Sequence, residues 1–391
     1  MLPTGLLEQG LERRVPALLS RARALLRLSG GPSDSLTPKE EKRAAEAIKA
    51  LHQGLVGDRV LARPETYDDA AHLGAYLLWW WPQSYAKVRG ALALAPASLA
   101  ALGKQPGRPT GKATILDLGA GPGPAAAAAL DHLALAGVKA EALLCDRSAA
   151  ALAEASGMIS TPLRTEERDL SRGAAGLPGE EGRFDLVCAA NVLSELPGSP
   201  ADRAALLRLA AGRLAPGGRM LLLEPALRET GRGLLEVRDL LLAPHAQPLF
   251  AHAPCFMQAP CPALEHPRDW CTAEQPWAPP AYFRSLSKAL GLHAAEAPVQ
   301  FAAVLLGAER PAGRPGLSRV VGLPPAEKGK KRLFICGETG RQPLVRLDRD
   351  AAPSNQALDL ATRGDVLRLT GLAEKGDGLR LPRDGTAELL K

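Results

Sequence analysis

The chain has 391 residues, of which 46% are hydrophobic and 23% are charged, and its formal net charge is +6. This length exceeds one typical core and predicts two or three domains, and the hydrophobic content excludes a disordered chain. No apolar run reaches the length of about 18 residues that a membrane span needs, and no secretory signal opens the chain. We therefore expect a cytoplasmic protein without a membrane partner.

Charge is distributed unevenly along the chain. Residues 1–110 hold 15 Lys and Arg against 10 Asp and Glu, residues 111–310 hold 18 against 22, and residues 311–391 hold 15 against 10. Basic flanks around a slightly acidic centre suit a polyanion such as RNA held at the ends, with a small ligand in the middle. An ordinary solvated surface explains such modest values equally well.

Residues 1–110 are predicted to form an N-terminal helical domain. The segment 38–55 starts at a proline, continues with acidic residues and has apolar positions at helical spacing. A second helix is expected to end at a break before Pro82, with another helix beyond it. Adjacent tryptophans in the Trp79–Trp81 run point in different directions on a helix, which favours packing over base stacking. The Gly/Pro-rich basic segment 102–112 predicts a linker.

The middle of the chain, 111–312, alternates strands with helices. The stretches ATILDL, AEALLCD, FDLVCAA and RMLLLEP predict buried strands, with helical segments between them. Such alternation predicts an α/β fold with a parallel sheet that is covered on both faces. Further along, FRSLSKALGL predicts a helix and VQFAAVLLGAE a late strand.

The last segment, 313–391, changes pattern again. Short alternating stretches such as RLFICGET and GDVLRLTGL are separated by Gly, Pro and Asp turns. They predict a small C-terminal β domain, either a barrel or a ribbon.

The stretch DLGAGPG lies between the first expected strand and a helix. Its glycines let the backbone pass close to a ligand, and the helix N-terminus offers free N–H groups. The spacing does not continue as a pyrophosphate cradle would, and the pattern resembles motif I of class I S-adenosylmethionine (AdoMet) methyltransferases. That resemblance implies a Rossmann-like sheet and a turn that faces the methionine part of AdoMet.

The same resemblance assigns roles to later residues. Asp146 would accept hydrogen bonds from both ribose hydroxyls, Asp169 would contact the adenine amino group, and Leu170 would lie against the ring. Asn191 and Glu195 leave the strand that lines the methyl-transfer side. The predicted AdoMet-binding residues are Asp117, Gly119, Gly121, Gly123, Asp146, Asp169, Leu170 and Asn191.

The catalytic residue stays unknown at this point. The motif-IV region lacks the (Asn/Asp)-Pro-Pro-(Tyr/Phe) clamp, and no Pro-Cys nucleophile follows a strand. Because the AdoMet sulfonium is already electrophilic, a methyltransferase needs only positioning and a base, and no base stands out. Cys145 and Cys188 lie inside apolar strands and are interpreted as core residues.

Three cysteines, Cys255, Cys261 and Cys271, lie in a proline-rich loop, 245–277, with the spacing C-x5-C-x9-C, and Cys336 follows near the end of the chain. Zinc sites usually supply C-x2–4-C knuckles, so these gaps favour a [4Fe–4S] cluster, with zinc and free thiols as alternatives. Such a centre would tie the C-terminal β domain to the sheet domain.

Taken together, DLGAGPG, the loop APC…PCP…DWC and the late CGE resemble the methyltransferase-like small-ribosomal-subunit assembly proteins of bacteria and mitochondria. WPQSY also resembles that family's Pro-x-(Ser/Thr)-Tyr segment, with tryptophan in place of an expected arginine, and DWCTAEQ departs from an expected WCHF. The resemblance implies a [4Fe–4S] cluster on the four cysteines, and association with the small ribosomal subunit during assembly.

Three functions remain open from the sequence. The first is an AdoMet-dependent methyltransferase for small-subunit rRNA, the second a non-catalytic ribosome assembly factor, and the third a small-molecule methyltransferase. Basic flanks and the extra β domain favour RNA over a small substrate, whereas the missing catalytic signature favours the second function over the first. We expect a monomer when the protein is off the ribosome.

Overall fold

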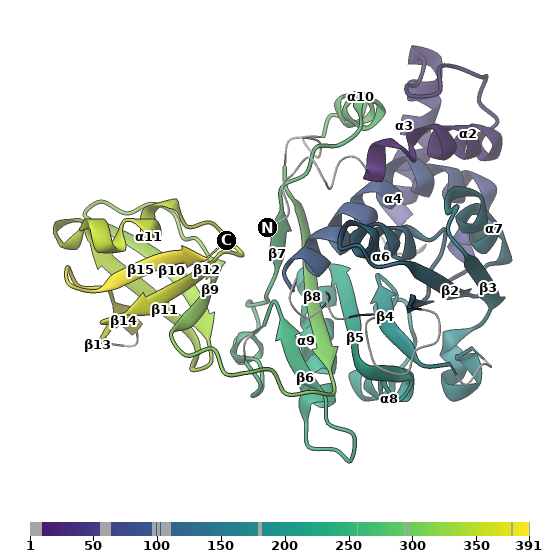
Figure 1. Ribbon diagram of the computed structural model, residues 1–391. Coiled ribbons are helices and arrows are strands. Elements are labelled where there is room, and N and C mark those ends of the chain that lie inside the picture. The colour runs from purple at the N-terminus through teal and green to yellow at the C-terminus, as the bar shows by residue number, and fades with distance from the viewer. Residues whose placement is uncertain are drawn as a thin grey trace.

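The computed structural model describes residues 10–54, 64–95, 99, 102, 111–178, 182–255, 257–292, 295, 297–376 and 378–390. The linker expected at 102–112 lies outside the described residues except at its ends. Figure 1 shows two β-sheets, with most of the helices gathered around the larger one.

The larger sheet carries the strands of the middle segment. They are β1 (Ala113–Leu118), β2 (Ala140–Asp146), β3 (Leu163–Glu167), β4 (Phe184–Ala190), β5 (Leu214–Pro225), β6 (Phe250–Ala253), β7 (Ala273–Gln275) and β8 (Val299–Gly307). The order is β3-β2-β1-β4-β5-β8-β6, and β7 also pairs with β8. Strands β1 to β5 pair in parallel, whereas β8 is antiparallel to β5, β6 and β7.

This order determines where a ligand can bind. The run β3-β2-β1-β4-β5 is a doubly wound arrangement in which the chain order reverses between β1 and β4. Ligands of such sheets bind outside the carboxyl ends of the strands at that switch point. The predicted α/β fold with a Rossmann-like sheet is confirmed.

Helices cover both faces of the sheet, as its alternating side chains require. Ile115 and Leu144 belong to one buried cluster, together with α6 (Pro124–Leu135) and α7 (Ala149–Met158). Leu116 and Leu143, their neighbours on β1 and β2, belong to the opposite cluster. That second cluster includes α8 (Pro200–Ala211) and α9 (Arg228–Leu242), and the sequence analysis does not predict α9.

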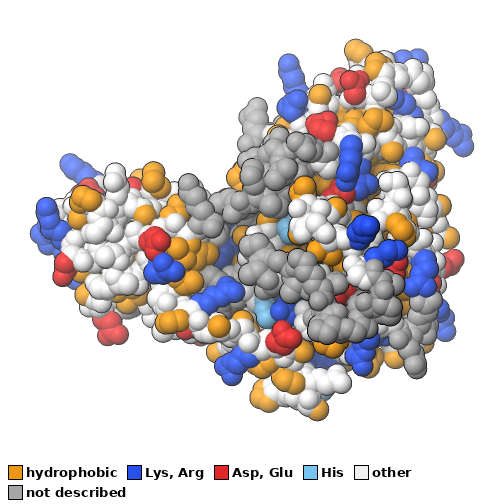
Figure 2. All heavy atoms as spheres, viewed as in Figure 1, with side chains coloured by type: hydrophobic (Ala, Val, Ile, Leu, Met, Phe, Trp, Pro, Cys, Tyr) orange, Lys and Arg blue, Asp and Glu red, His pale blue; other side chains and the backbone are white. Residues whose placement is uncertain are grey.

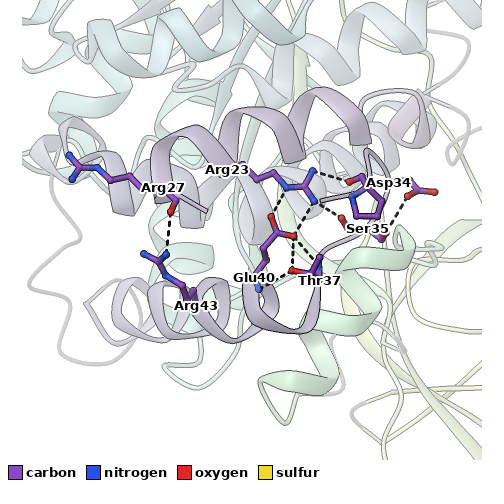
Figure 3. A network of polar contacts seen from close by, with 8 residues as sticks. Arg23, Arg27, Asp34, Ser35, Thr37, Glu40 and Arg43 are labelled. Carbon is purple, nitrogen blue, oxygen red and sulfur yellow. Dashed lines mark hydrogen bonds and ion pairs between the residues drawn. The ribbon is translucent and has the colours of Figure 1, made fainter. Parts of the chain in front are cut away.

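The N-terminal segment is helical, as expected, and packs onto the first of these faces. Its helices are α2 (Val15–Leu26), α3 (Pro38–His52) and α4 (Ala70–Ala93). Figure 3 shows how α2 and α3 are joined, with Arg23 and Thr37 both contacting the carboxylate of Glu40. Glu40 is 1% exposed, and it closes a capping box with Thr37 at the start of α3.

The break expected at Pro82 is wrong, because α4 runs unbroken through this residue. A proline inside a helix costs about 3 kcal/mol, since it removes one N–H donor and crowds the preceding turn. Nearly every residue of α4 from Leu77 to Ala93 is buried, so packing offsets that cost. The side-chain amide of Gln83 also donates to the carbonyl of Trp79, 2.8 Å away, in the turn around the proline.

The C-terminal segment forms a second sheet, as predicted. Its strands are β9 (Leu317–Gly322), β10 (Lys330–Gly337), β11 (Gly340–Leu347), β12 (Val366–Thr370), β13 (Ala373–Lys375), β14 (Gly378–Arg380) and β15 (Thr386–Leu390). Their order is β13-β14-β11-β10-β9-β12-β15. With α11 (Ala357–Leu360) this sheet encloses its own apolar core, which includes Val320, Leu344 and Leu358. Helix α10 (Ala281–Ala289) connects β7 to β8 of the larger sheet, and the chain enters the second sheet after β8.

Candidate functional site

A cavity of about 520 Å³ opens at the carboxyl ends of β1, β2 and β4, at the switch point of the sheet. This volume falls within the range of about 300–1,000 Å³ that is typical of small-molecule sites. Six of the eight residues predicted to bind AdoMet line it, namely Gly119, Gly121, Asp146, Asp169, Leu170 and Asn191.

The glycine turn after β1 forms one wall of this cavity. Gly119 and Gly121 have φ values of +67° and +53°, in the left-handed region that favours glycine. A Cβ on Gly119 would lie 2.3 Å from the side chain of Val192, so the turn has no room for one. A Cβ on Gly121 would meet no atom within 4 Å, because this residue faces open space.

The other two predicted residues of the motif lie behind the turn rather than in the cavity. Asp117 is 1% exposed, and its Oδ2 accepts a hydrogen bond from Ala126 N, 2.9 Å away, at the start of α6. Burial raises the pKa of Asp117 to about 7. Gly123 (φ +75°) begins α6, and a Cβ there would lie 3.0 Å from Ala155 and Ile159. Asp117 and Gly123 therefore shape the turn without lining the cavity.

Asp146 ends β2 with its carboxylate in the cavity wall. Its Oδ2 accepts from Gly121 N at 2.7 Å, and its Oδ1 accepts from Ser148 N at 2.9 Å. These two backbone donors fix the orientation of the carboxylate and leave each oxygen able to accept one more hydrogen bond. Burial raises the pKa of Asp146 above its ordinary value, although backbone hydrogen bonds to its oxygens oppose the shift.

Asp169 and Leu170 stand at the far end of the cavity, after β3. Asp169 caps a short helical turn, and its Oδ1 accepts from the amide and the hydroxyl of Ser171, at 3.0 and 2.6 Å. The hydrogen bond from the Ser171 hydroxyl lowers the pKa of Asp169. Leu170 is buried beside it and contributes an apolar surface.

Asn191 follows β4 in a left-handed conformation (φ +58°), which is uncommon for a residue other than glycine. Its Nδ2 donates to Ser84 Oγ, 3.3 Å away on α4. Its Oδ1 is buried and has no hydrogen-bond partner within the described ranges. A buried acceptor without a partner is costly in the free protein, and an N–H or O–H group of a bound molecule would satisfy it.

Helix α4 roofs the cavity, and the sequence analysis did not anticipate this role. Its residues in the cavity wall are Tyr76, Trp79, Trp80, Gln83, Ser84 and Lys87. Most of them recur at steps of three or four residues, which is the spacing of one helix face and could have been read from the sequence. Trp81 points elsewhere, and its Nε1 donates to the carbonyl of Pro122, 2.9 Å away, which holds the glycine turn.

Aromatic rings line the outer part of the cavity and form an aromatic wall, defined by His52, Tyr67, Tyr76, Trp79 and Trp80. The rings follow one another in contact: Tyr67 meets Tyr76 edge-on, and Tyr76 and His52 both stack on Trp80. Trp79 stacks on Phe283 of α10, with ring centroids 4.4 Å apart. The tryptophan run therefore serves both packing and the cavity surface.

The four cysteines of the proline-rich loop and the C-terminal domain line a second cavity, where the two sheets meet. Cys255 follows β6, Cys261 precedes a short 3-10 turn, Cys271 precedes β7, and Cys336 lies on β10. The expectation that Cys336 approaches the other three is therefore met. Cys145 and Cys188 are fully buried inside strands, as expected of core residues.

Two arginines donate to sulfur in this cysteine cavity. Arg238 Nη2 lies 3.5 Å from Cys255 Sγ, and Arg319 Nη1 lies 3.9 Å from Cys271 Sγ. Arg238 comes from the middle of α9, whereas Thr230, two turns earlier on the same helix, lines the first cavity. Neither arginine was predicted, because the sequence analysis does not predict α9 and no motif marks Arg319.

The protonation of these thiols bears on what the cysteine cavity can hold. Burial raises the pKa of both Cys261 and Cys336 to about 12, and for Cys336 the neighbouring thiols add to the shift. Buried thiols this close become thiolates together only when a cation compensates their charge. Among the described residues, no group of three or more His, Cys, Asp or Glu side chains is arranged to hold a metal ion.

Ionic contacts around the cysteine cavity also join the two sheets. Arg341 of β11 pairs with Asp269 at 3.0 Å, and Arg363 pairs with Glu274 of β7 at 3.3 Å.

Within the described parts of the chain, none of the helices combines the length and apolar character needed to cross a bilayer.

Comparison with known proteins supports the fold of the middle segment. Residues 116–220, from β1 into β5, match the family model of a methyltransferase domain. No curated protein matches the sequence at a significant level.

Among the solved structures to which the chain is similar are methyltransferases of low sequence identity. An S-adenosylmethionine-dependent methyltransferase from Clostridium acetobutylicum is 19% identical over 29% of this chain and 42% of that chain, with a TM-score of 0.23. The plantazolicin methyltransferase BpumL is 14% identical over 69% of this chain and 98% of that chain, with a TM-score of 0.34. A SAM-dependent methyltransferase from Thiobacillus denitrificans is 21% identical over 33% and 48%, with a TM-score of 0.23.

Proposed function

We propose that the cavity at the ends of β1, β2 and β4 binds AdoMet, and that the chain is an AdoMet-dependent methyltransferase. The observation that carries this proposal is the joint presence of the glycine turn, Asp146 and Asn191 on one cavity of about 520 Å³. These residues belong to the segment that matches a methyltransferase domain.

The donor and acceptor groups of the cavity fit AdoMet. Asp146 has one free acceptor position on each oxygen, as the two ribose hydroxyls require. The open space at Gly121 would admit the methionine part, and Leu170 with Asp169 would take the adenine ring and its amino group. Bound AdoMet would supply an electrophilic methyl group, and the side chains would hold it and orient the substrate.

For the substrate we propose RNA of the small ribosomal subunit, on three grounds. The cysteine and glycine motifs resemble a ribosome assembly family. The aromatic wall offers flat surfaces on which a nucleobase can stack. Lys and Arg exceed Asp and Glu in both flanking segments, and Figure 2 shows such side chains over the N-terminal helices and the C-terminal domain.

For the four cysteines we propose a structural [4Fe–4S] cluster. Four thiols from both sheet domains line one cavity, and Arg238 and Arg319 offer positive charge to the sulfurs. A zinc ion needs four sulfurs about 3.8 Å apart, because Zn–S bonds are about 2.3 Å long. A cubic cluster binds each thiolate through a different iron, so it suits thiols that are near one another without forming a compact tetrahedron.

The test of the methyltransferase has two stages. Isothermal titration calorimetry with AdoMet should detect binding, and absence of binding by the folded protein would refute the proposal. Small-subunit rRNA from cells with the protein, without it, and with Asp146→Asn should then be compared for methylated nucleotides. A modification present only with the wild-type protein supports RNA methylation. Binding without any lost modification would instead identify a non-catalytic assembly factor.

The cluster is tested on protein purified without oxygen. The purified protein should be brown and contain about four iron and four sulfide per chain. A colourless protein with one zinc per chain would refute the cluster and leave zinc as the resident metal. Cys188→Ala, a substitution of a core cysteine far from the cavity, should keep the iron and serves as the matched control.

A further inference from the structure

Lys87 lies on the cavity face of α4 and is not used by any contact described so far. We propose that Lys87 is the catalytic base of the AdoMet cavity, where its neutral amine removes the proton from the substrate atom that receives the methyl group. This inference rests on the proposed function and adds to it the residue that the motifs leave unnamed.

The course of α4 positions Lys87 on the substrate half of the cavity. Burial raises the pKa of Tyr76, and the charge of the nearby Asp146 adds to the shift, so Tyr76 marks the ribose half. Lys87 is about 16 Å further along the helix at a rise of 1.5 Å per residue. Between them, Ser84 accepts from Asn191 at the end of β4, where methyl transfer is expected.

The C-terminal end of α4 packs on the antiparallel strands β7 and β8 of the same sheet. A Cβ on Gly90 would lie 2.8 Å from the side chain of Gln275 on β7 and 3.4 Å from Phe301 on β8. Lys87 is one turn before Gly90 and shares the cavity wall with Gln300 of β8. It therefore stands beyond Asn191, on the side away from Asp146.

No counter-charge neutralises Lys87 within the described parts of the chain. It forms no hydrogen bond or ion pair there, and burial lowers its pKa to about 8, with no other group contributing. The other titratable groups that line the cavity are the acids Asp146, Asp169 and Glu195, the arginines Arg147 and Arg168, and His52, whose ring stacks on Trp80. Burial raises the pKa of Tyr67 and Tyr76 and the charge of Glu195 adds to both shifts, so Glu195 lies near these rings in the ribose half.

The position of Lys87 suits a base better than a charge partner. The other polar side chains near it, Gln83, Ser84 and Gln300, do not accept a proton at neutral pH. With a pKa of about 8, about a quarter of the Lys87 side chains would be neutral at pH 7.5, compared with about 0.1% for a free lysine. A general base works best when its pKa lies near the operating pH.

The step balances as an ordinary methyl transfer. A lone pair on the substrate nitrogen or oxygen attacks the methyl carbon of AdoMet, and the carbon–sulfur bond breaks with its electron pair moving to sulfur. The nucleophile loses its N–H or O–H proton to Lys87 Nζ, which becomes an ammonium group and later returns the proton to water. The substrate class is therefore a nucleophile with a removable N–H or O–H proton.

The first test does not depend on activity. Amine-selective acetylation at a series of pH values, read for each lysine by mass spectrometry, yields an apparent pKa for Lys87 in the wild-type protein. Lys49 on α3 is exposed and serves as the internal control. The Lys87 midpoint should lie about two pH units below the ordinary lysine value. Equal midpoints would overturn the proposal, whether or not the protein binds AdoMet.

The second test separates a base from an anion contact. Lys87→Met and Lys87→Arg should bind AdoMet with affinities within about twofold of wild type, because Lys87 lies away from Asp146. Both should slow methyl transfer to small-subunit rRNA in single-turnover assays by about 100-fold or more, the usual contribution of a general base. Activity retained by Lys87→Arg would reject the base, and so would a wild-type protein that binds AdoMet but transfers no methyl group. Wild-type protein that fails to bind AdoMet would instead refute the proposed function.

Discussion

Asp146 offers the sharpest test of the proposed AdoMet site, because each oxygen of its carboxylate already accepts one hydrogen bond from the backbone. Gly121 N and Ser148 N each donate to a different oxygen, at 2.7 and 2.9 Å. In the proposed complex the two remaining acceptor positions receive the ribose hydroxyls. Asp146→Asn turns one oxygen into an NH₂ donor, so one ribose contact is lost and one backbone N–H faces another donor.

The size of the effect follows from these contacts. A hydrogen bond to a charged group contributes about 1.5–3 kcal/mol, and each 1.4 kcal/mol changes a Kd by about tenfold. Losing one ribose contact therefore raises the Kd for AdoMet by about 10- to 150-fold. The unpaired backbone N–H also lowers the free energy of unfolding by about 1–3 kcal/mol.

Calorimetric titration with AdoMet and urea unfolding measure these two quantities separately. Asp202→Asn is the matched control, since this carboxylate also accepts from a backbone N–H, that of Ser199 at 2.8 Å, but does not line the cavity, and its Kd should stay within about twofold of wild type. An Asp146→Asn protein that folds normally and binds AdoMet as tightly as wild type would show that Asp146 does not hold the ribose.

Three other predictions address the turn, the buried acid and the cysteines. Trp81→Phe removes the donor to the carbonyl of Pro122 and should weaken AdoMet binding in calorimetry. Trp277→Phe, which loses a similar hydrogen bond to the carbonyl of Ala297, should not weaken it. Equal effects of the two substitutions would contradict a role of Trp81 in holding the glycine turn. Because burial raises the pKa of Asp117 to about 7, its folded form keeps a proton that the unfolded form releases near pH 4, so stability should fall as pH rises from about 4 to about 7. In Asp117→Asn, the decrease in the free energy of unfolding between pH 5 and pH 8, measured with urea, should be smaller than in wild type. An unchanged decrease would contradict the raised pKa of Asp117. Cys336→Ser should lose most of its iron and cleave faster between the two sheet domains in limited proteolysis; full iron content would exclude Cys336 as a ligand.

Local patterns were enough to predict much of the fold. The strands β1, β2, β4 and β5 carry continuous apolar runs, and the DLGAGPG turn lies where a strand meets a helix. Strand β3, with the sequence LRTEE, has no such run and was not predicted. Asp146 could be found because it ends the second strand, and the carboxyl ends of parallel strands meet at one edge. The convergence of Cys336 with the loop cysteines was predicted from residue type and resemblance to a family.

Other features depend on contacts between distant segments and could not be read locally. The helix α4 continues through Pro82 because its burial on several sides outweighs the cost of the proline. The helix α9 contains Gly231 and Gly233, which weaken its helical pattern, and a Cβ on Gly231 would lie 3.1 Å from Trp270. Lys87 carries no motif, and its lack of a counter-charge is visible only once the roof of the cavity is in place.

One consequence of α9 concerns its length rather than its side chains. Thr230 faces the AdoMet cavity and Arg238 the cysteine cavity, and the helix is continuous between them. Each helical residue turns the chain by about 100° and advances it by about 1.5 Å. Deleting a single residue from this interval would swing one of the two side chains away from its cavity, even though every remaining residue kept its identity. Substitutions at exposed positions of this interval can therefore be tolerated, whereas a change in the number of its residues cannot.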